Sequence, residues 1–517
     1  MPAELGVGSA QPTNGAGSTG TLRQLRRSAA MSDALLGTAG SILVAVGGFA
    51  VADVPRNSPV LADLGLDVMS YGHGKTLGGT IFWIGVALMV IAWVRIGRRV
   101  GPRLTSDGVT GVPSITMLRW TVVAWSVPLV FTVPLYSRDV YAYLGQGAVW
   151  VAGFNPYADG PAHNPGPVLD SMAQVWAATT APYGPMFMAI ARGVAELTGQ
   201  HVLTGVFVMR LVLLPGLVLA LWAIPRLAAR FGASPQAGIW LVLLNPMVVI
   251  HLVGGPHVEL LMMGVLVAGV VLMLDGRHVW ALVVLGLAVS IKITAGIAIP
   301  FMVWIWLSHI RSRRTVTPRD VVGVFAAVAL IPLAVFAAWT AGIGLGLGWL
   351  TGLGWADRIV NWFTIPTAVA HLVTLVAAPF TSLSLWPVLS VTRTIGAICL
   401  ALILVALWWR SRGDERSAIA GLAWAMLAVL LLEPSTLPWY YTWALCVAVA
   451  FTLPQWARAT IVFVSTFMLI VFQPDDSIIF YKLPEVILAA ALSALAAASL
   501  LRTDPLRIRA GLRRLWG

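Results

Sequence analysis

The sequence predicts an all-α, polytopic membrane protein, and three observations support this fold class. Of 517 residues, 58% are hydrophobic and 10% are charged, with a mean hydropathy of +0.86. A soluble chain carries roughly 25% charged residues. Many apolar runs approach the roughly 20 residues that a helix needs to cross a bilayer. Basic residues gather in the short loops between these runs, as in proteins whose basic loops stay in the cytoplasm.

The formal net charge is +12, from 33 basic and 21 acidic residues. In a soluble domain this excess would suggest a nucleic-acid partner. Here the basic residues flank apolar runs, so they indicate membrane anchoring, and we expect no nucleic-acid partner. The two cysteines, Cys399 and Cys446, both lie inside apolar runs. Their spacing therefore supports no metal site.

The positions of the basic loops fix the expected topology. Residues 1–30 are rich in Gly, Ser and Thr and end in arginines, which predicts a disordered cytoplasmic tail. Residues 31–503 form the expected transmembrane domain, and residues 504–517 form a basic cytoplasmic tail. The loop "RIGRRVGPR" is also cytoplasmic by this rule, so the segment after the third span lies outside. About 13–14 spans are expected, near 33–52, 78–96, 116–136, 203–225, 236–252, 258–274, two short ones between 277 and 311, 319–341, 389–409, 416–433, 438–453, 457–472 and 485–502.

Whether two apolar stretches cross the membrane depends on how many crossings, odd or even, lie between neighbouring basic loops. Residues 181–199 are fairly apolar, but a crossing there would place the basic loop near residue 226 outside. We therefore expect an amphipathic helix on the outer membrane surface. Between residues 277 and 311, parity favours two short spans with a break near Lys292, at or towards the outer face. The alternative is one long tilted span with Lys292 in mid-membrane, which would reverse the topology downstream.

This threading gives two large outer loops, 137–202 and 343–388, of which the first is expected to carry the catalytic residues. Polar residues outside the basic loops cluster on the outer face, among many tyrosines. A transporter would more often have charged residues near the membrane midplane and an internal repeat that relates its two halves. The pattern therefore favours a site on one face of the membrane.

Asp139 follows an apolar span directly, beside a loop rich in Gly, Asn and Pro. A carboxylate at a membrane boundary is costly and usually functional, and it can act as a general base towards an acceptor hydroxyl. The neighbouring Arg138 could keep it ionised or bind a phosphate. An Arg-Asp pair that only fixes a helix end is the alternative.

Other residues could bind an anionic, sugar-bearing lipid. Arg210 and Lys292 are candidate cations for its headgroup, unless they form internal salt bridges. His257 and Glu259 form an H-x-E pair, too few ligands for a metal, and Glu259 could simply favour a helix start. Aromatic rings can stack on sugars, although the segment "PSTLPWYYTW" could also be an interfacial anchor. The remaining sugar or acceptor candidates are Tyr136, Tyr143, Gln146, Asn155, Tyr157, Tyr183, Tyr440 and Tyr441.

No nucleotide-binding glycine motif is present, so an activated donor would arrive through the membrane. Five segments then indicate a family: "YSRDVYAYLGQGAVWVAGFNPYADGP", "TTAPYGPMF", "LNPMVVIHLVGGPHVELLM", "VSIKITAGIAIPF" and "LPWYYTW". These segments occur in the order found in the polyprenyl-phosphomannose-dependent α-1,6-mannosyltransferases of actinobacteria, which the chain resembles over roughly residues 35–500. The segment "KITAGIAIPF" and the length are closer to the elongating mannosyltransferase A than to the initiating mannosyltransferase B.

The resemblance implies a GT-C fold and a multi-pass plasma-membrane enzyme whose active site faces outside and whose termini are cytoplasmic. It implies a polyprenyl-phosphate-mannose donor and a lipid-anchored α-1,6-mannan acceptor of lipomannan and lipoarabinomannan. Asp139 matches the family's presumed base, and His257 and Glu259 match the flanks of a His-Asn-Glu triplet, with Val258 departing from the Asn. Neither a cofactor nor a metal is expected, because Arg and Lys could neutralise a monophosphate leaving group.

Two other functions fit the composition. A lipid-linked sugar flippase or transporter would line a path through the membrane with polar residues, and the outer-face clustering argues against it. A scaffold protein of envelope synthesis would tolerate replacement of Asp139 without loss of product.

Overall fold

The computed structural model describes residues 16–55, 59–101, 112–354, 359–360 and 362–506. Within these ranges the chain forms helices joined by turns, and the only extended pairing is one isolated bridge between Phe472 and Ile478. The predicted all-α fold is therefore confirmed.

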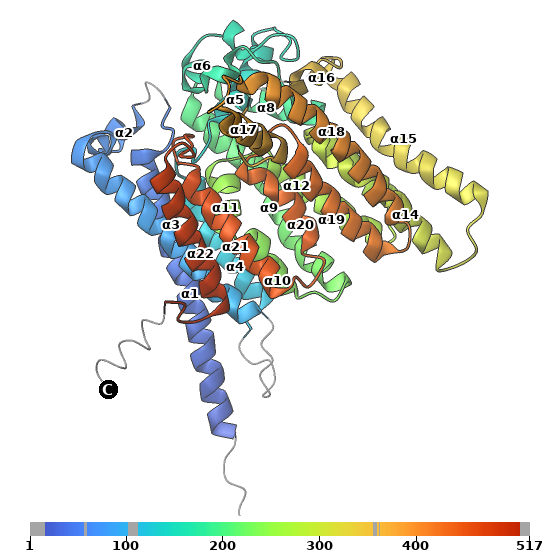
Figure 1. Cartoon of the computed structure of the whole chain (residues 1–517), viewed down its shortest axis with the longest axis horizontal. Helices are drawn as coiled ribbons and strands as arrows, with labels where there is room; N and C mark the ends of the chain where they lie inside the picture. Colours follow the sequence, from blue (N-terminus) through green and yellow to red (C-terminus); the bar gives the residue numbers. More distant parts are fainter. Residues whose placement is uncertain (1–15, 56–58, 102–111, 355–358, 361, 507–517) are drawn as a thin grey trace, which may run out of the picture.

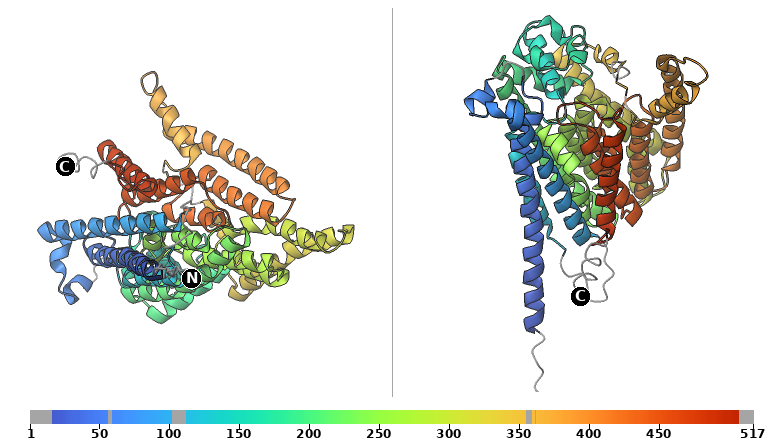
Figure 2. Two further views of the ribbon diagram at one scale, coloured as in Figure 1. Left: turned by 90° about the horizontal axis from the view of Figure 1, so that it is seen from below. Right: turned by 60° about the vertical axis from the view of Figure 1, so that its left-hand side comes forward.

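The helices form a bundle with two distinct ends (Figure 1). At the lower end lie the start of the long helix α1 (Ala16–Val51) and helix α10 (Pro235–Gly238); at the upper end lie several short helices. Figure 2 shows α1 continuing past the lower end of the bundle. The first helices of the bundle are α1, α3 (Gly72–Val100), α4 (Ile115–Val130) and α9 (Val202–Arg230), with the short α2 (Val60–Asp63) and 3₁₀ helix η1 (Asp67–Ser70) before α3.

Helix α12 (Glu259–Leu274) is the buried centre of the bundle. It is apolar on all sides, and almost every one of its residues is buried. A helix without a polar face needs neighbours all round, and α9 and α13 (His278–Ile291) pack closely on it. The remaining long helices are α14 (Ile299–Arg311), α15 (Pro318–Ile343), α18 (Leu385–Arg410), α19 (Glu415–Leu432), α21 (Gln455–Val471) and α22 (Leu483–Leu501), with the short α20 (Tyr441–Ala448) after η7 (Pro438–Tyr440).

The expected single span over 236–252 is instead broken. Residues Pro235–Leu243 and Pro246–Gly254 form two segments that meet at an angle of 53°. Pro246 cannot continue the preceding helix, and the Asn245 side chain caps the second segment by accepting from the Met247 N–H (3.1 Å). The segments comprise α10 with the π-helix η3 (Ile239–Leu243), and α11 (Pro246–Val249) with the π-helix η4 (Ile250–Gly254).

The number of spans follows from helix length and composition. In the described ranges, eight helices are long and apolar enough to cross a membrane, or nine if the bent pair is one span. Five further apolar helices have 10–17 residues. The protein is thus a multi-pass membrane protein, and the total of 13–14 spans stays a prediction that requires the shorter helices to cross as well.

The break expected near Lys292 is confirmed. Helix α13 ends at Ile291, the 3₁₀ helix η5 (Ile293–Ala298) follows, and α14 then begins. Two helices therefore replace the alternative of one long tilted helix. Lys292 lies at the turn between them, where its side chain contacts Glu259 at the start of α12.

The first predicted outer loop, 137–202, folds into a helical cap at the upper end. Its main helices, α5 (Asp139–Val151) and α8 (Pro185–Thr198), pack closely on each other. A side chain at Gly147 would lie 2.2 Å from the Ala191 carbonyl oxygen, so only glycine permits this approach. Helix α8 matches the amphipathic helix predicted over 181–199. The cap also contains η2 (Pro161–His163), α6 (Pro167–Ser171) and α7 (Gln174–Ala177).

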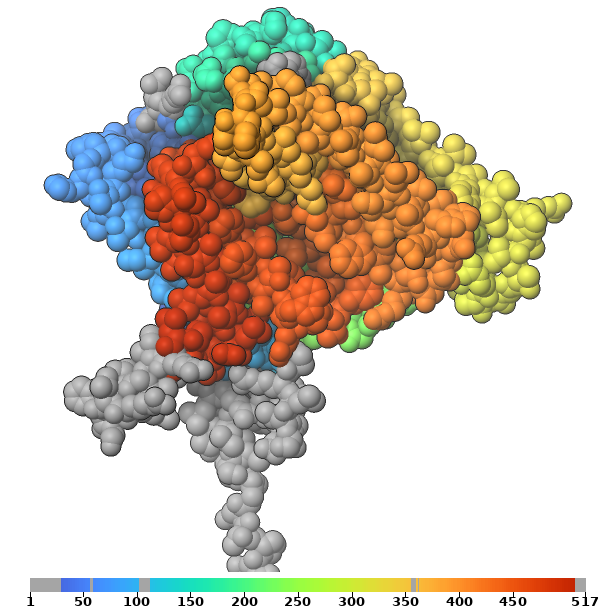
Figure 3. All heavy atoms as spheres, in the orientation of Figure 1, coloured from blue at the N-terminus to red at the C-terminus, as the bar shows by residue number. Residues whose placement is uncertain are grey.

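One expectation about an irregular segment is corrected. Residues 16–30, predicted as part of a disordered tail, continue helix α1 because good helix formers such as Leu, Gln, Arg and Ala precede the apolar run; residues 1–15 lie outside the described ranges. The second outer loop, 343–388, contains α16 (Trp349–Gly352) and the apolar helix α17 (Ile365–Ala377), which packs on α18. Figure 3 shows the α17–α18 region on the surface beside the cap. The predicted basic tail 504–517 is described only as far as residue 506.

Candidate active site

Asp139 is the first residue of α5, and its carboxylate faces a cavity. Its backbone N–H donates to Ser137 Oγ (3.1 Å), which starts the helix. A carboxylate in a first helical turn is stabilised by the helix dipole, and that effect alone could explain its position. Its side chain, however, is 21% exposed and lines a cavity of about 270 Å³. Asp139 is therefore placed to meet a ligand as well as to start a helix.

His257 lies behind Asp139 and is fully buried. Its Nδ1 lies 3.5 Å from Asp139 Oδ2, too far for a strong hydrogen bond. Its ring stacks on Trp439, with centroids 3.6 Å apart and planes 15° apart. Neither ring nitrogen has a hydrogen-bond partner among the described residues. The imidazole is thus held by stacking and can orient the Asp139 carboxylate.

Lys292 brings a positive charge to the same cavity. Its ammonium pairs with Glu259, whose side chain is 1% exposed, and lies 4.2 Å from the ring centre of Tyr440 and 5.2 Å from that of Trp443. Burial acts to lower the pKa of Lys292, but the Glu259 carboxylate outweighs it, so the pKa is raised. An ammonium has three donors. Glu259 takes one of them, so the cation can also bind an anionic ligand.

Gln146 is a buried group of the cavity without a protein partner for its carbonyl. It projects from α5, two turns after Asp139, and its Oε1 makes no hydrogen bond within the described residues. A buried polar atom without a partner is costly. A ligand hydroxyl in the cavity would remove that cost.

The loop before α8 positions Tyr183 against Lys292. The Gly184 N–H donates to the Ile291 carbonyl (3.1 Å), and a side chain at Gly184 would lie 2.3 Å from the Ser290 carbonyl oxygen. The cap is thereby tied to the end of α13. The predicted site residues that line the cavity are Asp139, Gln146, Tyr183, Lys292 and Tyr440.

Several other predicted residues support the cavity without lining it. The Tyr143 ring packs edge-on against Tyr183 (centroids 5.2 Å apart). The Tyr157 hydroxyl donates to the Tyr183 carbonyl (2.9 Å), and Asn155 Oδ1 accepts from the Tyr157 N–H (2.9 Å). Tyr441 begins α20 and is half-buried outside the cavity. These residues hold the cap loop in place, so their predicted direct contact with a sugar is not supported.

Arg210 was predicted to bind a donor phosphate, and the structure places it outside the candidate cavity. Its guanidinium is buried and donates to the backbone carbonyls of Val253 (3.1 Å), Gly254 (2.7 Å), Val130 (3.1 Å) and Thr132 (2.5 Å). Val253 and Gly254 end the π-helix η4, Val130 ends α4 and Thr132 follows it, so their carbonyls lack intrahelical donors. Arg210 thus satisfies helix ends and lies outside the cavity.

We expect Arg210→Lys to lower stability without changing the affinity for an anionic ligand. A lysine ammonium lacks the planar guanidinium of arginine and cannot bond to all four carbonyls. The buried carbonyls left without a donor should lower the free energy of unfolding by about 2–4 kcal/mol in total. Thermal unfolding in detergent should show the loss, with Arg226→Lys at the exposed end of α9 as the control. A selective loss of ligand binding at unchanged stability would contradict this assignment.

Arg138 and Tyr136 also lie outside the cavity. Arg138 Nε pairs with Asp53 (2.7 Å) and lines a separate polar cavity with Lys75. The Tyr136 hydroxyl donates to the Leu469 carbonyl (2.9 Å), and its backbone adopts a left-handed conformation (φ 67°). Neither residue lines the candidate cavity, and the neighbours Arg138 and Asp139 face different cavities.

Other lining residues were not among the predicted site residues. Trp443 lies in the aromatic segment "PSTLPWYYTW", and Thr179 and Thr180 begin the family segment "TTAPYGPMF", but none of the three was named as a site residue. Trp176 lies in "AQVWAA", where no motif marks it. The unpredicted polar or aromatic lining residues are Trp176, Thr179, Thr180, Thr294, Glu433, Ser435 and Trp443.

Glu433 is a carboxyl group whose protonation state follows from its surroundings. Burial raises its pKa to about 8, although Lys292 and the Thr436 hydroxyl act in the opposite direction. The cavity therefore holds one neutral carboxyl at pH 7 beside the Lys292–Glu259 pair. A neutral carboxyl can donate a hydrogen bond to a ligand oxygen.

The pKa of Glu433 predicts how stability depends on pH. Because it is raised from 4.5 to about 8 on folding, the folded state holds this proton more tightly than the unfolded state. The contribution of protonated Glu433 to the stability of the fold is complete below about pH 4.5 and is lost as the pH rises towards 8. We expect the fall in thermal stability between pH 5 and 8 to be smaller in Glu433→Gln than in the wild type. The exposed Glu485→Gln is the control, and equal slopes in all three proteins would contradict the assignment.

No group of three or more His, Cys, Asp or Glu side chains able to hold a metal ion occurs in the part of the chain that the structure describes. The predicted independence of metal and cofactor stays a prediction.

Comparison with known proteins identifies close relatives. Residues 34–308 match the family model "Alpha-(1->6)-mannopyranosyltransferase, N-terminal domain", and residues 366–502 match "MptB C-terminal domain". The chain is 42% identical to alpha-(1->6)-mannopyranosyltransferase A of Mycobacterium tuberculosis over 445 residues, which cover 86% of this chain and 85% of that protein. It is 33% identical to alpha-(1->6)-mannopyranosyltransferase A of Corynebacterium glutamicum (90% and 97% covered) and 32% identical to the B protein of that organism (80% and 71%).

Proposed function

Because the chain belongs to the α-(1→6)-mannopyranosyltransferase family, closer to its A members, and is an α-1,6-mannosyltransferase, we propose a specific reaction for it. The enzyme transfers mannose from polyprenyl-phosphate-mannose to the α-1,6-mannan backbone of lipomannan and lipoarabinomannan. The reaction takes place on the outer face of the plasma membrane, with both termini in the cytoplasm.

One observation carries the proposal: a carboxylate, Asp139, and a cation, Lys292, line the same cavity at the end of the bundle. A glycosyl transfer with one inversion needs one general base and stabilisation of the leaving group. It needs no nucleophile from the enzyme. The cavity has this combination, with aromatic rings and a buried amide beside it.

The roles follow from the chemistry of a β-mannosyl phosphate. Asp139 takes the proton of the acceptor 6-hydroxyl as that oxygen attacks the anomeric carbon. The bond from that carbon to the phosphate oxygen breaks, and its electron pair leaves with the lipid phosphate. Lys292 stabilises the charge that develops there. His257 orients Asp139, while Gln146, Tyr183 and Tyr440 hold the sugars.

Lipid donors and acceptors reach such a cavity from the membrane. The cap of residues 139–201 lies at the end of the bundle away from the start of α1 and from the basic turns, which supports an outer location under the positive-inside rule (Figure 1). The elongating role is supported by the 42% identity to the A protein of Mycobacterium tuberculosis, against 32% to the B protein of Corynebacterium glutamicum.

The stereochemistry of the product tests the proposal. Purified enzyme is given β-linked polyprenyl-phosphate-mannose and an α-1,6-dimannoside, and the anomeric configuration of the new linkage is determined by NMR. We expect an α-1,6-trimannoside. A β-linked product, or movement of the lipid-linked sugar across vesicles without any transfer, would contradict the proposal and favour a retaining enzyme or a flippase.

A further inference from the structure

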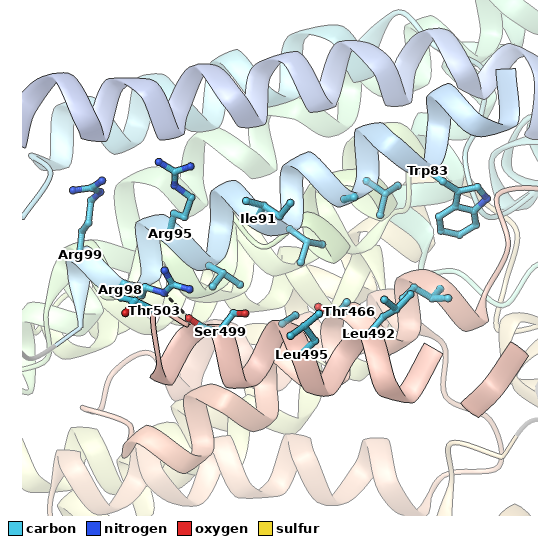
Figure 4. Close-up of a pocket in the computed structure, with 16 residues that line it drawn as sticks. Trp83, Ile91, Arg95, Arg98, Arg99, Thr466, Leu492, Leu495, Ser499 and Thr503 are labelled. Atoms are coloured by element: carbon cyan, nitrogen blue, oxygen red, sulfur yellow. Dashed lines mark hydrogen bonds between the residues drawn. The ribbon is translucent and has the colours of Figure 1, made fainter. Parts of the chain in front are cut away.

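A second cavity lies away from the candidate active site. It is a groove of about 890 Å³ between α3 and α22, with Thr466 and Ile470 of α21 also lining it. Figure 4 shows its two ends: Trp83 lies at one, and Arg95, Arg98 and Arg99 gather at the other. The three arginines are the only charged residues among its sixteen lining residues.

The apolar body of the groove has the dimensions of a lipid chain. From Trp83 to Arg98, helix α3 rises about 22 Å at 1.5 Å per residue. One leaflet of a bilayer is about 15 Å deep, half of a roughly 30 Å hydrocarbon core. An acyl chain can therefore lie extended along α3, in contact with Ile91 and Leu495.

The arginine end carries an excess of positive charge. Arg95 and Arg99 share one buried carboxylate, Asp33, at 2.6 and 2.8 Å. Arg98 donates through Nε to the Ser499 carbonyl and so bridges the two walls of the groove. Among the described residues that line the groove, three are arginines and none carries a carboxylate; Asp33 of α1 pairs with two of the arginines. An anionic group at this end would balance the charge.

We propose that this groove is a binding site for an anionic phospholipid of the cytoplasmic leaflet. One acyl chain lies between α3 and α22, and the phosphate contacts Arg98, whereas Arg95 and Arg99 point towards α1 (Figure 4). This end of α3 lies at the opposite end of the bundle from the active-site cap (Figure 1), so the site is independent of the proposed reaction. The charge decides against the polyprenyl chain of a donor as the occupant. The phosphate of a donor would lie at the Trp83 end, and Arg98 would face only hydrocarbon.

Native mass spectrometry of the purified full chain tests the headgroup preference. The probes are phosphatidylglycerol and phosphatidylcholine with identical acyl chains. We expect one phosphatidylglycerol to bind roughly tenfold more tightly than phosphatidylcholine, since each basic residue near a lipid headgroup changes affinity about fivefold. Arg98→Gln should weaken phosphatidylglycerol about fivefold and leave phosphatidylcholine unchanged. The control is Arg226→Gln, an exposed arginine at the same end of the bundle that lies outside the groove.

A second variant keeps the proposal testable if Arg98→Gln is unstable. Ala496→Trp fills the groove and should abolish tight binding of both lipids, whereas Leu402→Trp, on the exposed face of α18, should not. Equal affinities for the two lipids, or unchanged binding in Ala496→Trp, would overturn the proposal. So would displacement of phosphatidylglycerol by polyprenyl phosphate with no effect of Arg98→Gln, since the groove would then hold the donor chain.

Discussion

Asp139→Asn should reduce mannosyl transfer by roughly 10²- to 10⁴-fold, the usual contribution of a general base. The amide keeps the size of the side chain and can still accept a hydrogen bond, but it cannot take a proton from the acceptor hydroxyl. The cavity itself should be unchanged, because the backbone N–H of this residue, which bonds to Ser137, is retained. Initial rates in membranes supplied with radiolabelled donor and a short α-1,6-mannoside measure the effect.

The matched control for this variant is Asp170→Asn. Asp170 lies in the same cap but on an exposed turn of α6, outside the cavity. We expect it to keep the wild-type rate. If Asp139→Asn also kept the wild-type rate, Asp139 would be only a helix-start residue, and Glu259 and Glu433 would be the next candidates for the base.

The Lys292–Glu259 pair should give the largest effect on stability. Lys292→Met leaves Glu259 buried without its cation, and such an unpaired charge costs about 3–5 kcal/mol. The double variant Lys292→Met/Glu259→Gln removes both charges, so it should recover most of the lost stability. It should not recover transfer, because no cation would then stabilise the leaving phosphate.

Thermal unfolding and transfer rates of the two single variants and the double variant separate these roles. Stability should be low when only one of the two charges is removed and higher when both are removed. Activity should be lost whenever the Lys292 ammonium is absent. A double variant that regained both stability and transfer would show that Lys292 has a purely structural role.

Much of the fold could be predicted from hydropathy and charge. The break at Lys292 and the helix over 185–198 followed from parity, because a wrong crossing would have placed basic loops outside. The bend at Asn245 was missed, since the apolar run continues through Pro246 and hydropathy does not register a proline. Helix α1 was predicted too short because composition alone suggested disorder.

The candidate site was predicted in part. Asp139 and Lys292 stood out as charges in apolar surroundings, and the fold brings both to one cavity. Arg210 stood out for the same reason but binds helix-end carbonyls, which no sequence pattern marks. The sequence could not show that Arg138 and Asp139 face different cavities, because that depends on the backbone turn at Tyr136.

The most direct test of the central claim measures donor binding and transfer on one variant. Wild type and Asp139→Asn in proteoliposomes are loaded with radiolabelled polyprenyl-phosphate-mannose, and bound donor is quantified. An α-1,6-mannoside acceptor is then added for a single turnover. If Asp139 is the base, both proteins bind the donor equally and only the wild type transfers mannose. Transfer at the wild-type rate by Asp139→Asn would contradict the account.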